Sequence, residues 1–422
     1  MKRIVLTTFG SYGDLHPYIA VARGLIARGH EAVIATTELY RNKVEQTGVG
    51  FHATRPNLAD LGDQAEVVRR VYDPRRGAEY MTRQLIMPHL PRTFDDLVGG
   101  ARGADVLVSH AITYAAPLVA RKLGLPWLST ILSPMVFLST YDPPTLPPAP
   151  WLKHLHHVSP ALYRVAFRAM RSTVRSWSEP VRALARERGL PEPDGDPLFE
   201  GQFSPHGTLA MFSSVLAKPQ PDWPPRTHVT GFPFHDADEV NSHPARALDD
   251  FLAAGDAPIV FTLGSSAVFD ARDFYRQALE IARQLGRRAV LLTGRLAGDQ
   301  GLDTLPRDFF AIDYAPHSAV FPRAAAVVHQ GGIGTLAQAL RAGRPMLVIP
   351  FSHDQPDNAE RAVRLGVALR IPRAKFSVDR GVAALRELLE DPRFAQAAQR
   401  VAQRIAGEDG VGAACDRIEA ML

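Results

Sequence analysis

The chain has 422 residues, of which 46% are hydrophobic and 22% charged, a composition typical of globular proteins and a length too great for one ordinary core. Its formal net charge of +4 is too small to indicate a nucleic-acid-binding protein, and its single cysteine, Cys415, excludes an internal disulfide or a metal site built from cysteines. We therefore expect two globular domains in the cytoplasm without a membrane-spanning helix, because no apolar run approaches about 18 residues.

The first part of the chain alternates short apolar segments with helical patterns. The segments are RIVLTT, HEAVIAT and ADVLVSH, and the first helix is predicted around Ile19–Arg28. Such alternation predicts a parallel β-sheet covered by helices on both faces. The N-terminal segment MKRIVLTTFG is predicted to be a strand rather than a signal peptide, because its apolar run is only about six residues long.

A proline-rich segment, Tyr141–Pro150, interrupts this alternation and is predicted to be a loop. It precedes a long amphipathic pattern from Tyr163 to Leu184, in which arginines form a second stripe and Pro180 should kink or divide the helix. The simplest interpretation places the apolar face on the core and the arginines in solvent. A membrane-surface helix and a wall of an acceptor pocket are the alternatives.

The second half repeats the alternation with APIVFTLGSS, a helix at Phe274–Gln284, RRAVLLTG, FFAIDYA, AAAVVHQGG and PMLVIPF. We predict an N-terminal domain at 1–217, a proline-rich linker at 218–240, a second domain at 241–405, and a C-terminal helix at 406–422 that could return to the first domain. The predicted fold class is α/β, with two doubly wound domains facing each other across a cleft. Ligands are expected at the carboxyl ends of the strands.

The strand that ends at His329 is followed by Gly331, Gly332 and Gly334 just before a helical pattern. Backbone N–H groups at such a junction can bind a phosphate, although a glycine turn that binds nothing is the alternative. Asp354 and Gln355 follow the next strand. Their oxygens and amide suit the hydroxyls of a sugar, although simple turn and helix-capping roles would explain them too.

Together these motifs resemble the nucleotide-sugar glycosyltransferases that include plant UDP-glycosyltransferases. The long motif HQGGIGTLAQALRAGRPMLVIPFSHDQPDNA is most similar to the bacterial and sterol-type branch, which includes rhamnosyltransferases and macrolide or flavonoid glycosyltransferases. YAPH, FTLGSS and GSYGDLHP resemble further motifs of the family in the same order, so the resemblance covers most of the chain. It implies a GT-B fold, with the nucleotide in the C-terminal domain and the acceptor in the N-terminal one.

By position, the resemblance implies a donor site of Ser265, Tyr314, Ala315, His317, His329, Gly331, Gly332, Gly334, Thr335, Gln338, Asp354 and Gln355. Tyr314 would stack on the base, His329 and the glycine turn would surround the diphosphate, and Asp354 with Gln355 would bind the transferred sugar. Gln338 replaces the plant glutamate that binds the ribose, and an amide is a weaker acceptor than a carboxylate. A weaker contact there penalises uridine more than deoxythymidine, which lacks the 2′-hydroxyl. UDP-glucose is the first expectation for the donor, and dTDP-rhamnose follows closely as the second.

The resemblance also implies an inverting transfer in which a base near the first strand accepts the proton of the acceptor hydroxyl. Asp14 occupies the position of that base, and His110 stands where plant relatives have an aspartate. We expect Asp14 to act directly or through His110, with His16 as the competing base. The alternatives are that Asp14 only caps a helix beginning near Pro17 and that His110 is a structural histidine.

Apolar side chains in the variable parts of the first domain predict a lipophilic or aromatic acceptor such as a flavonoid, polyketide, sterol or hydroxy-fatty acid. The candidate acceptor residues, about half of which core packing would also explain, are Met81, Leu85, Met87, Met135, Phe137, Tyr141 and Trp151. We expect no metal or other cofactor, because the HLHH segment lacks nearby acids and helical i,i+4 spacing. A sugar-nucleotide epimerase and a non-catalytic helper protein are the rival functions, and the sequence does not indicate an oligomeric state.

Overall fold

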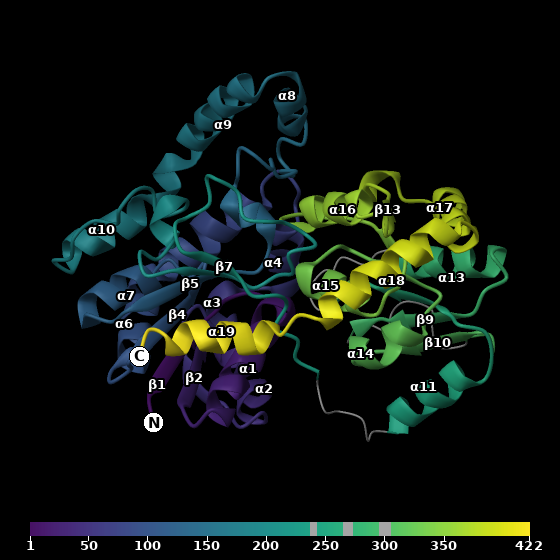
Figure 1. Cartoon of the computed structure of the whole chain (residues 1–422), viewed down its shortest axis with the longest axis horizontal. Coiled ribbons are helices and arrows are strands. Elements are labelled where there is room, and N and C mark those ends of the chain that lie inside the picture. The colour runs from purple at the N-terminus through teal and green to yellow at the C-terminus, as the bar shows by residue number, and fades with distance from the viewer. Residues whose placement is uncertain (237–242, 265–272, 295–304) are drawn as a thin grey trace. The chain divides into compact units, whose positions relative to one another are not determined.

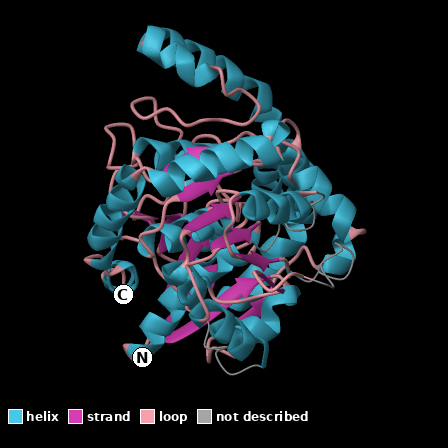
Figure 2. Cartoon of the chain, turned by 90° about the vertical axis from the view of Figure 1, so that its right-hand side faces the viewer, coloured by secondary structure: helices cyan, strands magenta, loops and turns pink. Residues whose placement is uncertain are grey.

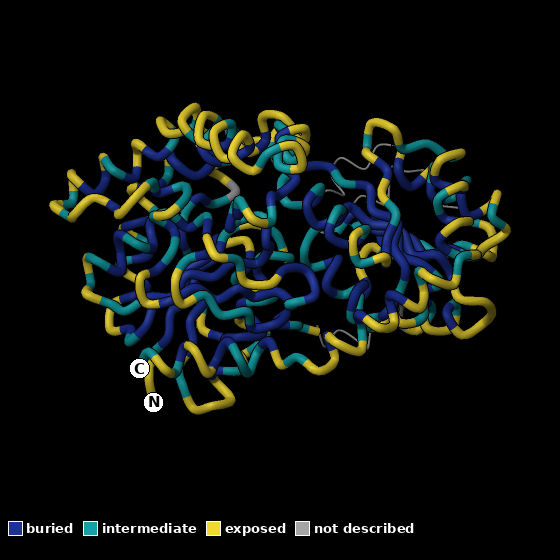
Figure 3. Tube along the Cα trace, turned by 45° about the horizontal axis from the view of Figure 1, so that its top comes forward, coloured by how far each residue is buried: buried dark blue, intermediate teal, exposed yellow. Residues whose placement is uncertain are grey.

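The structure, a computed structural model, describes residues 1–236, 243–264, 273–294 and 305–422. These residues form two compact units. Unit 1 consists of Met1–Val71, Arg75–His235 and Glu408–Leu422, and unit 2 consists of Tyr72–Pro74 and Asp236–Gly407. Each unit contains its own parallel β-sheet, whose buried strands are dark blue in Figure 3.

The sheet of unit 1 has seven strands in the order β3-β2-β1-β4-β5-β6-β7. Their bounds are Arg3–Thr7 (β1), Glu31–Thr36 (β2), Gly50–Ala53 (β3), Val106–His110 (β4), Trp127–Ile131 (β5), Thr208–Ala210 (β6) and Thr227–Val229 (β7). All pairs are parallel, and β1 lies between β2 and β4. The strand order therefore changes direction between β1 and β4, the position where ligands bind in doubly wound sheets.

The segment predicted to be a linker differs from that expectation, because Thr227–Val229 forms the edge strand β7 of unit 1. Its β-branched residues favour an extended strand between the surrounding prolines. The compact part of unit 1 continues to His235.

The first helix, α1, spans Tyr12–Ala27, so the prediction that a helix begins near Pro17 was wrong. Ser11 caps α1: its side chain accepts from the Gly13 N–H, and the Asp14 side chain accepts from the Ser11 N–H. Pro17 lies inside the helix. The sequence pattern missed the first turn because Gly13, Asp14 and Pro17 favour a turn or a helix boundary, whereas the cap depends on side-chain hydrogen bonds.

Unit 1 contains further helices. Their bounds are Arg41–Glu45 (α2), Leu58–Leu61 (α3), Gln64–Val71 (α4), Gly77–Tyr80 (α5), Leu90–Ala101 (α6), Ala116–Leu123 (α7), Leu152–Val158 (α8), Pro160–Val174 (α9), Glu179–Glu187 (α10) and Gly410–Glu419 (α19). A π-helical turn at Met81–Ile86 precedes α6. Residues 141–150 form neither helix nor strand, as predicted.

The long amphipathic pattern is divided, as the proline predicted. A 3-10 turn at Arg175–Ser178 separates α9 from α10, and Pro180 lies in the first turn of α10. Val181 and Leu184 join the main core of unit 1, next to residues of α6 and α7. The apolar face of this pattern thus packs on the protein, which confirms the simplest interpretation for that face.

The sheet of unit 2 has six strands in the order β10-β9-β8-β11-β12-β13. Their bounds are Ile259–Thr262 (β8), Ala289–Leu292 (β9), Phe309–Ile312 (β10), Ala326–His329 (β11), Met346–Val348 (β12) and Ala368–Arg370 (β13). The direction of the order changes between β8 and β11, as it does between β1 and β4 in unit 1. The core of unit 2 is centred on Phe261, Val328 and Leu347.

The helices of unit 2 include the predicted helix Phe274–Gln284 with its predicted bounds. They are His243–Ala253 (α11), Phe274–Gln284 (α13), His317–Val320 (α14), Ile333–Arg341 (α15), Gln355–Arg364 (α16), Val378–Glu390 (α17) and Pro392–Ala406 (α18). Within the described ranges of both units, no helix has the length and apolar character needed to cross a membrane.

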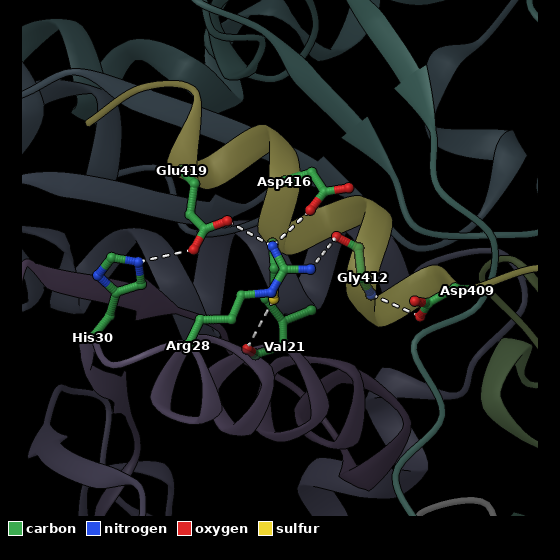
Figure 4. Close-up of polar contacts among 8 residues, drawn as sticks. Val21, Arg28, His30, Asp409, Gly412, Asp416 and Glu419 are labelled. Atoms are coloured by element: carbon green, nitrogen blue, oxygen red, sulfur yellow. Dashed lines mark hydrogen bonds and ion pairs between the residues drawn. The ribbon is translucent and has the colours of Figure 1, made fainter.

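Helix α19 packs on α1 (Figures 1 and 4). The Arg28 guanidinium donates to Asp416 and Glu419, both at 2.6 Å, and to the Gly412 carbonyl at 3.2 Å. His30 contacts Glu419 at 2.9 Å. The last helix of the chain therefore belongs to unit 1.

Candidate active site

Three loops meet at the carboxyl ends of β8, β11 and β12, which are neighbours in the sheet of unit 2. The Gln330 amide packs so closely on the first two loops that a Cβ on Gly264 or Gly332 would lie 2.3 or 2.8 Å from its Nε2. The Asn358 amide joins the second loop to the third, because it donates to the Gly331 carbonyl at 3.0 Å and to Asp354 at 2.7 Å. The predicted meeting of the glycine turn with Asp354 is therefore confirmed.

The glycine turn needs a glycine at position 331. Gly331 has a φ of +89°, and a Cβ there would lie 2.9 Å from the Val348 side chain and 3.1 Å from the Gln355 carbonyl oxygen. Gly332 is the N-cap of α15 and brings no capping side chain. The N–H groups of the first turn of α15 are thus left for another acceptor, which is the arrangement that binds anions at helix N-termini.

His329 places a hydrogen-bond donor beside this helix end. Its ring is fully buried, and its Nδ1 accepts from the Gly331 N–H at 3.0 Å, so a neutral ring carries its proton on Nε2. Burial lowers the pKa of His329 to about 3, and the nearby His317 lowers it too. Nε2 has no hydrogen-bond partner among the described residues, and a buried donor of this kind needs a water or a ligand as its acceptor.

The predicted base-binding residues surround the start of α14. Tyr314 is 44% exposed, whereas Ala315 is buried. His317 stacks on Phe321 with 4.4 Å between ring centroids, and burial lowers its pKa to about 4. Thr335 is buried in the first turn of α15, next to Gly334.

Gln338 is held in a network that the sequence did not reveal. Its Oε1 accepts from Arg341 at 2.8 Å, and Arg341 also forms an ion pair with Asp236 at 2.7 Å. The Asp236 carboxylate in turn hydrogen-bonds to Gln338 and Ser318. The amide oxygen that would accept from a ribose hydroxyl therefore already has a partner.

Asp354 and Gln355 begin α16, but the Asp354 side chain does not cap that helix. Gln355 is buried, and its Oε1 accepts from the N–H groups of Phe351 at 2.9 Å and Ser352 at 3.3 Å. Gln355 therefore fixes the loop after β12 and has only its Nε2 group left to donate. Ser265, the remaining predicted donor residue, lies outside the described residues.

Sequence reasoning missed Asn358 and Gln330. Both are buried, and both join loops that are separate in the sequence. Asn358 lies four residues after Asp354, so helical i,i+4 spacing was the signal that could have placed their side chains together. Asp357 and Arg361 show the same spacing and form a fully buried ion pair at 2.6 Å.

In unit 1, Asp14 follows β1 at the position where the strand order changes direction. Its Oδ2 accepts from the backbone N–H of Ser11 at 2.7 Å and from the Ser11 hydroxyl at 3.0 Å. Within the described residues Oδ1 makes no hydrogen bond, so one carboxylate oxygen stays available while the other caps α1. Asp14 does have the structural role that we considered, and that role leaves room for a catalytic one.

His110 ends β4, the strand next to β1. It is buried, and burial lowers its pKa while the charge of Asp14 raises it. Its ring meets the edge of the Tyr18 ring at 6.1 Å, and burial raises the pKa of the Tyr18 phenol. The structure therefore brings Asp14 and His110 within range of a direct charge interaction.

His16 lies among other side chains. Its ring stacks on Tyr12 at 5.4 Å and meets His235 edge-on at 5.3 Å. Beside His110 lies a cavity of about 10 Å³, lined in part by Tyr114 and Gln202. This space suits one water molecule.

The candidate acceptor residues divide by exposure. Met87 belongs to the main core of unit 1, and Phe137 stacks on Trp223 with 4.0 Å between centroids. Leu85 is buried as well, Met81 and Met135 are half-buried, and Tyr141 and Trp151 are exposed. Core packing thus accounts for the burial of Met87 and Phe137, and the acceptor role of all seven residues stays a prediction.

His154, His156 and His157 lie on and around α8 with their rings near one another. Among the residues that the structure describes, no group of three or more His, Cys, Asp or Glu side chains is arranged to hold a metal ion.

Two family models match the chain. Residues 4–128 match the glycosyltransferase family 28 N-terminal domain. Residues 289–421 match the C-terminal domain described as erythromycin biosynthesis protein CIII-like. The second match contains the glycine turn and Asp354, and the first contains Asp14 and His110.

Curated relatives match over nearly the whole chain. O-mycaminosyltylonolide 6-deoxyallosyltransferase of Streptomyces fradiae is 36% identical over 429 residues, which cover 99% of this chain and 97% of the relative. Sterol 3-beta-glucosyltransferase UGT80A2 of Arabidopsis thaliana is 28% identical over 439 residues, which cover 98% of this chain. The chain spans only 64% of the length of that second relative.

Solved structures show the same fold. The glycosyltransferase of kitacinnamycin has a TM-score of 0.73 at 23% identity and covers 100% of this chain and 99% of that one. The spinosyn rhamnosyltransferase SpnG, complexed with thymidine diphosphate, has a TM-score of 0.69 at 18% identity, with both chains covered completely. The expected GT-B fold is confirmed.

The resemblance stated from the motifs is confirmed too, since the Streptomyces relative matches along almost its whole length. The chain therefore belongs to the UDP-glycosyltransferase-like family of GT-B glycosyltransferases and is an enzyme that transfers a sugar.

Proposed function

We propose that the enzyme transfers a deoxyhexose, with inversion, from a thymidine diphosphate sugar to a hydroxyl group of a lipophilic acceptor such as a polyketide. The observation that supports it most directly is the buried Nε2–H of His329 beside the uncapped first turn of α15. Together they would bind the diphosphate and stabilise the leaving group without a metal ion or other cofactor.

The environment of Gln338 supports a thymidine rather than a uridine donor. Arg341 already donates to its amide oxygen, so a ribose 2′-hydroxyl would meet a poor acceptor, and deoxythymidine lacks that hydroxyl. The Streptomyces relative is named as a 6-deoxyallosyltransferase, and SpnG binds thymidine diphosphate. UDP-glucose, the first expectation from the sequence, is the alternative donor.

In the proposed reaction Asp14 is the base that takes the proton of the acceptor hydroxyl as the sugar bond forms and the nucleoside diphosphate leaves. Oδ2 is held by Ser11, which would fix the carboxylate so that Oδ1 faces the acceptor. His110 would modulate that base through the charge interaction between them. We place the reaction in the cytoplasm, which is supported only by the cysteine content.

The test uses labelled dTDP-rhamnose and UDP-glucose with a polyketide, a flavonol, a sterol and a hydroxy-fatty acid. Asp14→Asn should lower kcat by a factor on the order of a hundred or more, with the Kd for thymidine diphosphate unchanged. Asp60→Asn is the matched control, because Asp60 caps α3 through the Asn57 N–H in the same way. Full activity of Asp14→Asn, or equal losses in both variants, would contradict the proposed base.

Donor choice is tested by Gln338→Glu. A carboxylate accepts more strongly from ribose hydroxyls, so the ratio of kcat/KM for UDP-sugar over dTDP-sugar should rise about tenfold. Gln403→Glu, an exposed change on α18, should leave the ratio as it is. Conversion of the sugar nucleotide to another one in the absence of an acceptor would instead indicate an epimerase. The absence of turnover with every donor would indicate a helper protein.

A further inference from the structure

One segment of unit 1 has a composition that sugar transfer does not explain. Residues 151–178, which we call the basic arm, comprise α8, α9 and the 3-10 turn that follows. They contain no Asp or Glu, although 44 acids in 422 residues would give about three (28 × 44/422). They contain five basic residues, Lys153, Arg164, Arg168, Arg171 and Arg175.

The inner face of the basic arm is already packed. Tyr163 and Phe167 of α9 and Leu152 of α8 form a small buried cluster of their own, with the half-buried Leu138 and Leu146 of the preceding loop against it. Tyr163 and Phe167 stack with 5.7 Å between centroids. This cluster fixes the position of α9, so the residues on its other side remain on the surface.

The outer face is apolar. Trp151 is 59% exposed, Val158 78%, Leu162 47% and Val165 64%. The arm thus provides four of the eleven large hydrophobic side chains that are exposed in the described part of the chain. Leu162 and Val165 are three positions apart on α9 and therefore share one side of that helix, whereas Val158 ends α8, which the extended residue Ser159 separates from α9. In Figures 1 and 2 α9 lies at the edge of unit 1, away from its sheet.

The same face is positively charged. Arg164, Arg168 and Arg175 are exposed, and none of them forms an ion pair with an acid that the structure describes. Arg171 differs, since it pairs with Glu200 and lies 4.1 Å from the centre of the Phe199 ring. Arg164 and Arg168 lie on α9 within a few residues of Leu162 and Val165, and Arg175 begins the 3-10 turn that follows. Helix α9 is about 22 Å long from its 15 residues.

We propose that the basic arm binds the surface of membranes that contain anionic lipids. A tryptophan and aliphatic side chains that enter the headgroup region, flanked by arginines and without acids, are the composition of helices that lie in a membrane interface. A second copy of this face is a poor partner, because a twofold contact would bring arginines against arginines. Nucleic acid would leave the aliphatic stripe in water.

Vesicle flotation tests this binding independently of the sugar donor and of catalysis. The protein should float with vesicles of phosphatidylcholine containing 30% phosphatidylglycerol and remain unbound with pure phosphatidylcholine, and added salt should release it. Arg164→Gln/Arg168→Gln/Arg175→Gln should weaken partitioning on the order of a hundredfold. Arg386→Gln/Arg400→Gln/Arg404→Gln removes the same charge from exposed sites on α17 and α18 and should bind as the parent does.

The apolar part is tested by Leu162→Ser/Val165→Ser and by tryptophan emission. Both serines replace exposed residues, so circular dichroism and the thermal midpoint should be unchanged while vesicle binding falls. Anionic vesicles should shift the emission to the blue, and Trp151→Phe should remove most of that shift, because Trp127 and Trp223 are buried and Trp177 is half-buried.

Three results would overturn the membrane assignment. The first is that the protein does not float with anionic vesicles at low salt. The second is that the triple arginine variant of the arm and its control on α17 and α18 lose vesicle binding equally. The third is that neither the arginine variant nor the serine variant of the arm binds vesicles more weakly than the parent. Sedimentation velocity tests whether a second copy of the chain binds this face instead. If the protein is a dimer that binds no vesicles, and Leu162→Ser/Val165→Ser converts it to a monomer, a second copy covers this face.

Discussion

His329 shows how one side chain acquires a chemical role from its position. The ring is fully buried, and the Gly331 N–H occupies its Nδ1. With a pKa of about 3 the ring is neutral at physiological pH, so it offers a proton on Nε2 without bringing a positive charge. In the proposed donor site the attraction for a diphosphate would then come mainly from N–H dipoles, those of His329 and of the first turn of α15.

The buried ring also makes stability depend on pH. Between about pH 3 and pH 6.5 the unfolded chain binds a proton at this position and the native state does not, so stability falls as the pH decreases. At pH 5 the loss should be about 2 kcal/mol. His317 adds a similar loss at pH 5, but over the narrower range between about pH 4 and pH 6.5, because burial lowers its pKa to about 4.

We therefore expect His329→Asn to flatten this dependence, since the Asn oxygen can still accept from the Gly331 N–H but does not titrate. Urea unfolding measures the free energy of unfolding at pH 7 and at pH 5. The difference between these two free energies should be about 2 kcal/mol smaller in His329→Asn than in the parent. His206→Asn, on an exposed histidine, is the control. An unchanged difference in His329→Asn would show that the ring is protonated in the native state.

The sequence was informative about which residue types lie at the site and uninformative about their partners. Strand-end position and a glycine turn were enough to predict His329 and Gly331. The capture of the Gln338 oxygen by Arg341 and Asp236 could not be predicted, because Asp236 lies about a hundred residues earlier and only the fold brings it there. Asn358 was missed for a similar reason, since its contact with Gly331 joins two loops.

At the scale of elements, the contact between α1 and α19 depends on a glycine. A Cβ at Gly24 would lie 2.6 Å from the Val411 Cγ1 and 2.9 Å from the Cys415 sulfur. The two helices therefore approach closely at this point, and the hydrogen bonds of Arg28 lie beside it (Figure 4).

Gly24→Ala should destabilise the protein by about 1–3 kcal/mol, because the added methyl group overfills the contact. The sign is informative, since the same change in an exposed helix stabilises by roughly 0.5–1 kcal/mol. Gly99→Ala provides that comparison: Gly99 is exposed in α6 and a Cβ there would have no neighbour closer than 3.9 Å. Free energies from urea unfolding should move in opposite directions. A stabilised Gly24→Ala would mean that α19 is not seated on α1 in solution.

Helix and strand types were predictable where hydrophobic periodicity was strong. The helix Phe274–Gln284 agrees with its prediction, and Pro180 divides the long pattern as its missing N–H requires. The start of α1 and the edge strand β7 were not predicted. Both depend on few residues, a side-chain cap in one case and three residues paired to β6 in the other.

At the scale of the whole molecule, both units place their candidate residues by the same rule. Asp14 and His110 follow adjacent strands β1 and β4, and Gly264 and His329 lie at the ends of adjacent strands β8 and β11. In each sheet this is the place where the order of strands changes direction. The sequence therefore predicted the two parallel sheets and the sheet edge at which the candidate residues lie. The assignment of each segment to a unit required the contacts between residues in the structure.

For the C-terminal segment the sequence offered a return to the first domain only as a possibility, and the contacts place residues 408–422 in unit 1 although the chain reaches them from unit 2. Ala414, Cys415 and Ile418 are fully buried, and the Glu408 side chain accepts from Ser213 at 2.7 Å. Their contacts are with unit 1, so removing them should leave the sheet of unit 2 intact.

Truncation after Gly407 should therefore destabilise unit 1 by at least about 3 kcal/mol, from the apolar area of α19 that is lost. Hydrogen exchange should become on the order of a hundredfold faster in α1, where the partners of Arg28 and His30 are gone, while α15 and β11 keep their protection. Truncation after Ala420 retains Ile418 and Glu419 and should behave as the full chain. Faster exchange in α15 with α1 unchanged would instead assign α19 to unit 2, and the donor site, rather than the neighbourhood of Asp14, would then depend on the end of the chain.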